Sequence, residues 1–546
     1  MIESAASGKS ISQIQAWRFC YWGVLGALFA LAAWQRFAPP LDPIADPDTW
    51  GYVAPALQKL IGAGFVHTDG RNFVYPAFLF LVLRVFGDFR AIVITQHLFG
   101  LAAGGVLVLT WRRTRVIVPN SRVSLASHSV LGLVAAAIFL LAGDPIRFEM
   151  QLRPEGVCAF LVSLNLYFAI QFIACSFMEQ RRWPAVAHGI GTAFTAVLLA
   201  SAKPSFALVA VLSFLPVGIL LFRRGWLGQK IALGSGVAVS AVLLLLPEHF
   251  LSRNDEASQT FLPTTLFVVH ANLIRDQMAD DLERGAAIPY SRELLGRVHD
   301  ALGIEIAQSS AAHPEHYPSL GFSPDHLMYE ETSIAAQLRR EFDNNIPALC
   351  EFYRFYYWRI WQHRPLLVVK KIARQMAIFY SPMCPGYSRG KSMSLAIWYR
   401  DATRNLQVES YPEVWTKYPP ALEFTRRSEV LARTAGAIQQ RAATRVFLSV
   451  LAATYLPLFL STLVLSAALL FQPADRKRLG WFAVLVLFVY SYNAASCLAV
   501  AIVNSLDVPR YNTVQIFFTI VAQFLALWFL CEVSLLKRQN ASLRKT

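Results

Sequence analysis

Long apolar runs recur along the chain, and one extended polar region lies between Leu246 and Val446. Because lipid supplies no hydrogen-bond partners to the backbone, runs of this length cross a bilayer as helices. The pattern therefore predicts an all-α polytopic membrane protein. Its ten expected spans are Phe19–Phe37, Ile92–Trp111, Ser129–Leu141, Gly156–Phe177, Ala185–Ala202, Phe206–Phe222, Ile231–Leu246, Val446–Phe471, Trp481–Val503 and Val514–Val533.

A further apolar segment, Phe73–Phe86, is shorter and contains Pro76 and Arg84. Segments of this length are typical of interfacial or re-entrant helices. We therefore expect Phe73–Phe86 not to cross the membrane, so that Asp88 stays on the same side as the loop that precedes the segment.

The spacing of the apolar runs predicts three parts. Residues 1–246 form an N-terminal transmembrane module whose first outer loop is 38–90, and the first run is expected to remain as an uncleaved span. Residues 247–445 form a mostly helical extracytoplasmic domain. Residues 446–546 form the C-terminal transmembrane helices and a tail.

The charge of the chain fits this topology. Of 546 residues, 55% are hydrophobic and 16% are charged, and the net charge is +15. If Phe73–Phe86 does not cross, the positive-inside rule places five basic clusters and the N-terminus on one, cytoplasmic face. These clusters lie at 112–115, 181–182, 223–224, 476–478 and 537–545. We therefore attribute the positive charge to topology and to membrane lipids, and we expect no nucleic acid partner.

The stretch 350–380 mixes aromatic residues with six basic ones. We expect two helices broken at Pro365, lying in the headgroup layer with their bases on lipid phosphates. The alternative is an amphipathic core helix of the extracytoplasmic domain. A disulfide between Cys350 and Cys384 is left open, because sequence does not show whether their Cα atoms are within reach.

Acidic and basic residues are predicted to meet on the outer face. Each has a simpler role available: Asp48 and Glu155 can cap helices, and Lys203 can extend toward the headgroups. Together, two or more carboxylates with several cations suit a phosphate-bearing lipid substrate, with a carboxylate as general base. The residues are Asp46, Asp48, Arg153, Glu155, Lys203, Arg510 and Tyr511.

Part of the sequence is similar to a known family. The runs are Pro47-Asp48-Thr49-Trp50-Gly51-Tyr52-Val53-x-x-Ala56, then Gly70-Arg71-x-x-x-Tyr75-Pro76, then Phe86-Gly87, and Gln96. They resemble bacterial glycosyltransferases of the GT-C fold, whose relatives include protein O-mannosyltransferases and lipid A aminoarabinose transferases. The resemblance covers about residues 40–160.

The resemblance implies a GT-C-like helical bundle in the bacterial inner membrane with its active site on the outer face. The enzyme would transfer a sugar, with inversion, from a polyprenyl-phosphate carrier to a glycan, lipid or protein acceptor. Asp48 falls at the catalytic acidic position, Glu155 at an acidic position of a second outer loop, and Arg510-Tyr511 at an arginine–tyrosine pair. Tyr52 and Arg71 would bind substrate, together with Arg153 and Lys203.

This chain departs from the family pattern at Thr49. Many relatives have a second acid directly after the first, and here Thr49 takes that place. Asp46 is therefore a second candidate for the catalytic acid. The cofactor stays unknown, because no clear motif supports a divalent metal.

Two other function classes stay open. One is a transporter or flippase for lipids or glycans, although the charges crowd one face and no pair of corresponding broken helices is visible. The other is an enzyme like the O-antigen ligases or polymerases. The sequence has no GxxxxGK[ST] loop, which argues against ATP-driven work by this chain.

Overall fold

A computed structural model describes the chain except for residues 1–10, 66–70, 254, 407–415 and 544–546. Helices make up 80% of it. The N-terminal elements are α1 (Ile11–Phe37), α2 (Thr49–Leu60), α3 (Val74–Phe86), α4 (Arg90–Thr114), η1 (Arg115–Ile117), α5 (Leu125–Leu141), α6 (Gly143–Met150), α7 (Glu155–Ile173), the π-helical turn η2 (Ala174–Met178), α8 (Arg182–Ala202), η3 (Pro204–Phe206), α9 (Ala207–Ser213), α10 (Leu215–Phe222) and α11 (Leu227–Ser252).

The following elements are also almost entirely helical. They are α12 (Glu256–Val269), α13 (Ala271–Arg284), α14 (Arg292–Ala312), α15 (Pro324–Tyr329), α16 (Ile334–Glu341), α17 (Ile346–His363), α18 (Pro365–Phe379), β1 (Ser392–Ser394), α19 (Leu395–Leu406), α21 (Pro419–Thr434), β2 (Ala437–Gln439), α22 (Ala442–Phe471), α23 (Pro473–Val503), α24 (Pro509–Thr513) and α25 (Ile516–Leu543). The two strands pair antiparallel, with Met393 opposite Ile438.

The helices confirm an all-α polytopic membrane protein. Within the described residues, nine helices are long and apolar enough to span a membrane, and α5 with α6, bent by 45°, would make a tenth. The apolar segment before Gly87 forms α3, which has 13 residues. At 1.5 Å per residue it reaches roughly 20 Å, short of the roughly 30 Å hydrocarbon core.

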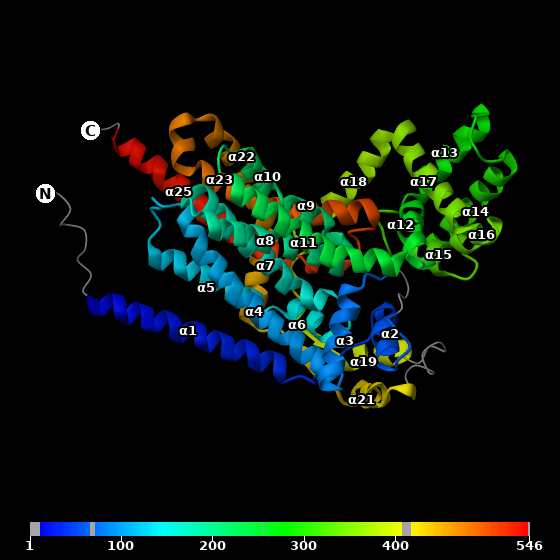
Figure 1. Cartoon of the computed structure of the whole chain (residues 1–546), viewed down its shortest axis with the longest axis horizontal. Coiled ribbons are helices and arrows are strands. Elements are labelled where there is room, and N and C mark those ends of the chain that lie inside the picture. The colour runs from blue at the N-terminus through cyan, green and yellow to red at the C-terminus, as the bar shows by residue number, and fades with distance from the viewer. Residues whose placement is uncertain (1–10, 66–70, 254, 407–415, 544–546) are drawn as a thin grey trace.

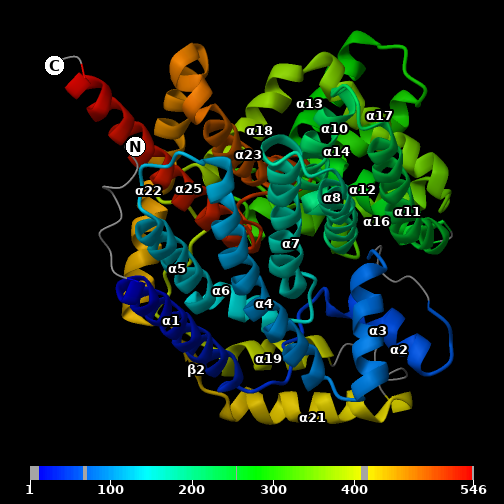
Figure 2. The same cartoon turned by 60° about the vertical axis from the view of Figure 1, so that its left-hand side comes forward.

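The spans form a bundle around the C-terminal helix. In the apolar stretch of α25, 83% of residues are buried, against 17% in α1 and 11% in α11, which lie at the periphery. The start of α1 and the end of α25 lie at the same end of the bundle, and α2, α3, α19 and α21 lie at the other (Figure 1). Figure 2 shows the same separation from a second direction.

Residues 247–445 contribute to two hydrophobic cores. Helices α12–α17 form a lobe with a core of its own, to which Phe267, Met278, Leu302 and Tyr356 belong. The later part joins the core of the bundle instead, for example through Tyr399 and Phe424. The division of the chain at 246 and 445 stays a prediction.

The break at Pro365 is confirmed, since α17 ends at His363 and α18 begins at Pro365. Two of the six basic residues, Arg359 of α17 and Arg364 directly after it, are placed differently from the expectation. Arg359 pairs with Asp281 at 2.6 Å and Arg364 with Asp280 at 2.5 Å, both acids of α13. These two arginines therefore bind neighbouring carboxylates and not lipid phosphates, because α17 packs into the lobe.

The thiols of Cys350 and Cys384 are both free. Each is buried, and the two belong to different packing environments: Cys384 lies in the bundle core, whereas Cys350 donates its Sγ–H to the carbonyl of Gln259 in the lobe at 3.5 Å. The structure does not contain the disulfide that the sequence left open.

Candidate functional site at the outer end of the bundle

The site begins with the loop that leads into α2. Asp46 donates its backbone N–H to the Thr49 hydroxyl at 2.8 Å, and its Oδ1 accepts the N–H of Asp48 at 2.9 Å. Asp48 occupies the N-cap position but makes no side-chain cap bond, because its backbone is helical where a capping residue is normally extended. The carboxylate of Asp48 is therefore free to face the site.

A short backbone bridge brings this loop against the start of α7. Ile44 donates its N–H to the carbonyl of Met150 at 2.8 Å, and Leu152 donates to the carbonyl of Ile44 at 3.1 Å. Gln96 of α4 donates its side-chain amide to the carbonyls of Glu149 and Gln151. The bridge fixes Arg153, which follows Leu152, beside the two aspartates.

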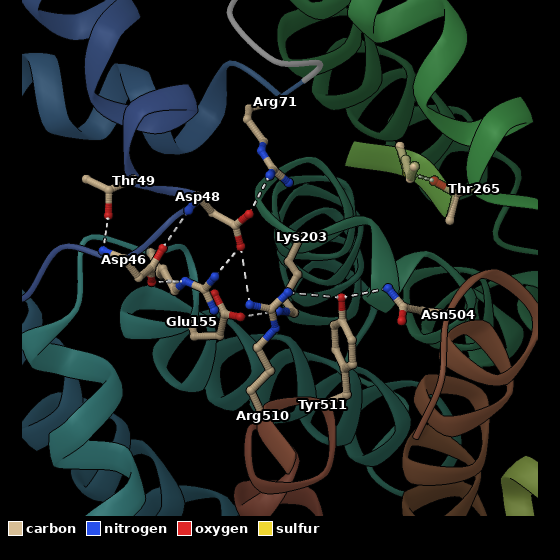
Figure 3. A network of polar contacts seen from close by, with 12 residues as sticks. Asp46, Asp48, Thr49, Arg71, Glu155, Lys203, Thr265, Asn504, Arg510 and Tyr511 are labelled. Carbon is tan, nitrogen blue, oxygen red and sulfur yellow. Dashed lines mark hydrogen bonds and ion pairs between the residues drawn. The ribbon is translucent and has the colours of Figure 1, made fainter. Parts of the chain in front are cut away.

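Asp48 lies at the centre of a cluster of guanidinium groups (Figure 3). Its Oδ1 pairs with Arg71 at 2.8 Å and its Oδ2 with Arg510 of α24 at 3.2 Å. Arg153 forms ion pairs with both Asp46 and Asp48. Gly70, which precedes Arg71 in the sequence motif, lies outside the described residues.

A second ion pair lies beside this cluster. Lys203, in the break between α8 and η3, bonds Glu155 Oε1 at 2.5 Å. Its ammonium also lies 5.2 Å from the ring centre of Tyr511, whose hydroxyl accepts a hydrogen bond from Asn504 at 3.0 Å. Glu155 makes this ion pair instead of capping α7, and Lys203 is buried rather than extended toward the headgroups.

Tyr52 completes the predicted set. The Arg71 guanidinium lies 5.3 Å from the centre of its ring, and Tyr75 packs edge-on against the same ring. The structure thus brings together all nine residues predicted for the site: Asp46, Asp48, Tyr52, Arg71, Arg153, Glu155, Lys203, Arg510 and Tyr511.

The three carboxylates differ in environment. The Asp48 side chain is 25% exposed, against 15% for Asp46 and 4% for Glu155, so Asp48 is the most accessible to a ligand. Burial raises the pKa of Asp46 to about 6, and the Arg153 guanidinium offsets part of that effect. Burial also acts on Asp48, but Arg153, Arg71 and Arg510 outweigh it and hold its pKa below the ordinary value.

The lobe supplies a contact that the sequence did not indicate. The Arg71 guanidinium lies 5.6 Å from the ring centre of Phe261 in α12. Phe261 belongs to a segment without a motif or a charge cluster. Asn504 lies seven residues before Tyr511, and nothing in the sequence marked it as the partner of that tyrosine.

A buried charged cluster surrounds Glu149, the residue directly before the backbone bridge between Ile44 and Met150. Arg36 of α1 binds both carboxylate oxygens of Glu149, at 2.8 and 3.0 Å, and donates to the carbonyl of Leu140 at 2.7 Å. His97 Nδ1 lies 2.8 Å from Glu149 Oε2. A Cβ on Gly100 would lie 1.9 Å from Glu149 Oε1, so glycine leaves the room that this carboxylate occupies.

In the described part of the chain, no group of three or more His, Cys, Asp or Glu side chains is arranged to hold a metal ion. The carboxylates of the site are instead paired with basic side chains. Comparison with family models, curated proteins and solved structures found no match to this chain.

Proposed function

We propose that the chain is a membrane glycosyltransferase of the GT-C type that takes a sugar from a polyprenyl-phosphate carrier. The acceptor would be a glycan, lipid or protein of the cell envelope, and the site would face outward from a bacterial inner membrane. The positive-inside pattern supports that orientation, because it places the opposite end of the bundle in the cytoplasm.

The observation that carries the proposal is the convergence of four basic and three acidic side chains at one end of the spans. They come from five separate segments: the loop before α2, the segment before α3, the start of α7, the break after α8, and α24. Guanidinium groups match the geometry of phosphate oxygens, and the end of a bundle is where a lipid phosphate would lie. Ionisable side chains gathered among membrane spans are commonly functional, even where they pair with one another as these do.

In the proposed step, an acceptor hydroxyl attacks the anomeric carbon of the donor. The new bond forms between the acceptor oxygen and that carbon, and the bond between the carbon and the phosphate oxygen breaks. The phosphate leaves with the electron pair, and the acceptor proton passes to a carboxylate. Asp48 is the first choice as base because it is the most exposed of the three carboxylates, and Asp46 is the second.

Binding of the donor would prepare Asp48 for this role. In the structure, its pKa is held down by Arg153, Arg71 and Arg510. A donor phosphate engaging these guanidinium groups would offset their charge and raise the basicity of Asp48. Arg510 and Lys203 would then stabilise the charge that develops on the departing phosphate, and Glu155 would hold Lys203 in place.

The position of the site also bears on the transporter alternative. Secondary transporters bind their substrates near the bilayer midplane, at the interface of structural repeats. Here the charged cluster lies at one end of the bundle, beside the helices α2 and α3 (Figure 1). The geometry therefore favours chemistry at the membrane surface over passage through the bundle.

The test compares Asp48→Asn with Asp46→Asn in purified protein given a panel of polyprenyl-phosphate monosaccharides, together with a cell-envelope extract that supplies glycan, lipid and protein hydroxyls as acceptors. The readout is release of the free polyprenyl phosphate. Asp48→Asn should lower turnover by roughly two to four orders of magnitude while donor binding persists, and Asp46→Asn should cost less. Asp300→Asn, at an exposed lobe carboxylate, serves as the matched control.

Each contrary outcome has a defined meaning. If Asp46→Asn is inactive and Asp48→Asn is not, the base is Asp46. If both variants release polyprenyl phosphate at the wild-type rate, the reaction does not use this cluster. If the wild-type protein releases none from any donor in the panel, the transferase proposal is wrong.

A further inference from the structure

A groove lies on the lobe where the peripheral helix α11 ends. One hollow, which we call the main hollow because both Arg253 and Arg354 line it, has a volume of about 480 Å³ and is formed by the end of α11, by α12 and by α17. An adjoining hollow of about 590 Å³ continues along α17 and shares Gln259, Arg354 and Trp358 with the first. The main hollow is lined by Ser252, Arg253, Ser258, Gln259, Leu262, Pro263, Leu266, Arg354, Tyr357 and Trp358. We call the two hollows together the arginine groove.

The arginine groove continues an apolar surface that belongs to a span. Leu246 and Phe250, near the end of α11, are 45% and 64% exposed, and Leu262 and Trp358 in the groove are 50% and 60% exposed. Exposed apolar side chains along a spanning helix contact acyl chains in the membrane. The aromatic pair Tyr357 and Trp358 suits the depth of the headgroups, where amphipathic rings concentrate.

The charge in the groove is positive. Arg253 and Arg354 are exposed, and neither makes an ion pair with an acid within the described residues. Their neighbour Arg359, on the same helix as Arg354, is in contrast paired with Asp281. Among the described residues that line the main hollow there is no carboxylate, and Glu351 lines the adjoining one.

We propose that the arginine groove binds the headgroup of an anionic membrane phospholipid. Arg253 and Arg354 would bind the phosphate through charge-assisted hydrogen bonds, and the acyl chains would lie along Leu246, Phe250 and Leu262. The inference does not depend on the transferase proposal, because its residues are separate from those that surround Asp48.

The bound lipid would hold the lobe against the membrane. Helix α12 contributes Phe267 to the lobe core, and α17 contributes Tyr353 and Tyr356. Helix α12 also carries Phe261, the ring next to Arg71 in the site. A lipid in the arginine groove therefore stabilises the position of the same helix that borders the candidate site.

The first test is native mass spectrometry of the full-length protein in detergent, titrated separately with phosphatidylglycerol and phosphatidylcholine. The wild-type protein should bind phosphatidylglycerol more tightly. The double variant R253Q/R354Q should lose at least about tenfold in that affinity, since it removes two charge-assisted contacts, and should bind phosphatidylcholine as before. Millimolar inorganic phosphate should not displace the lipid, because it lacks the acyl chains.

The matched control is R284Q/R340Q, which removes two exposed arginines of the same lobe outside the groove. It should bind phosphatidylglycerol like the wild type. The proposal is overturned if R253Q/R354Q keeps its affinity, if the control loses as much, or if the two lipids bind equally well.

A second test leaves both arginines in place, in case their replacement prevents folding. A photoreactive benzoylphenylalanine replaces Leu262, and the protein is irradiated in native membranes. We expect a cross-linked anionic phospholipid, identified by mass spectrometry. Cross-linking to another protein, or to zwitterionic lipid in proportion to its abundance, would overturn the proposal.

Discussion

Asp46 and Asp48 are two residues apart, share Arg153 as a partner, and have pKa values shifted in opposite directions. The difference follows from their other partners. Asp48 also meets Arg71 and Arg510, whereas one oxygen of Asp46 is used by the backbone N–H of Asp48. Asp46 is therefore the group of the pair that changes charge close to physiological pH.

This assignment predicts a pH dependence of ligand binding. Below about pH 6 Asp46 takes up a proton and loses its negative charge, so the site becomes more positive. Binding of a short-chain sugar phosphodiester, whose single charge is constant over this range, should tighten by roughly tenfold from pH 7 to pH 5. Isothermal titration calorimetry measures the change.

Asp46→Asn provides the control for that experiment. Because its side chain is a neutral amide at both pH values, this variant should bind the phosphodiester tightly at pH 5 and at pH 7, so that binding no longer depends on pH. A pH profile that is unchanged in Asp46→Asn would assign the titration to another group.

At the scale of elements, the features that were predicted from the sequence are those that depend on residues close together along the chain. The apolar spans and the break at Pro365 were predicted, because apolar runs and proline act on their own neighbourhood. Asp48 also precedes a helix, as a capping residue would, but it makes no cap bond. Helix α6 was not predicted, since it is a short helix bent by 45° from α5 and carries no apolar run of its own.

Contacts between elements that are far apart in the sequence were also not predicted. Asp42, before α2, accepts hydrogen bonds from Arg427 of α21 at 2.5 Å and from Arg90 at 3.2 Å, and its carbonyl accepts the Tyr399 hydroxyl at 2.5 Å. These partners hold the first outer loop against α19 and α21. Neither Arg427 nor Tyr399 stands in a pattern that distinguishes it from other arginines and tyrosines of 247–445. Most of the site residues were predicted for a different reason, since charges at the ends of spans are uncommon and stand out. Tyr52 and Arg71 were predicted from the family resemblance alone.

The ion pair between Arg36 and Glu149 joins α1 to α6, and both side chains are almost fully buried. Arg36→Met should therefore destabilise the protein by about 3–5 kcal/mol, because it leaves Glu149 buried without its cation. The double variant R36M/E149M should lose less, since it removes both charges. Thermal unfolding in detergent distinguishes the two, and Arg84→Met, at an exposed arginine of α3, is the control. Equal losses in the single and double variants would contradict the assignment.

At the scale of the whole molecule, the prediction concerns topology. Because α3 is too short to cross, Asp88 should lie on the outer face with the site. A cysteine in place of Asp88, in a background without the native cysteines, should react with an impermeant thiol reagent added outside intact cells. Labelling that requires permeabilised cells would show that α3 crosses, and the number and orientation of the following spans would then change.

The lobe was predicted as mostly helical, but its part in the site was not. The sequence places 247–445 outside the membrane without showing which part folds back over the bundle. Phe261 reaches the site through the packing of α12, which depends on a core of apolar residues spread over the whole lobe. Such packing has no local sequence signature.

The loop just before α24, the helix that carries Arg510, is hydrogen-bonded to the lobe. Asp507 accepts hydrogen bonds from the backbone and hydroxyl of Ser319, and Gln375 of α18 accepts the N–H of Leu506 at 2.7 Å. These hydrogen bonds connect the residues just before Arg510 to the lobe. We therefore expect the position of the lobe to differ between the occupied and the vacant site if a ligand displaces Arg510 from Asp48.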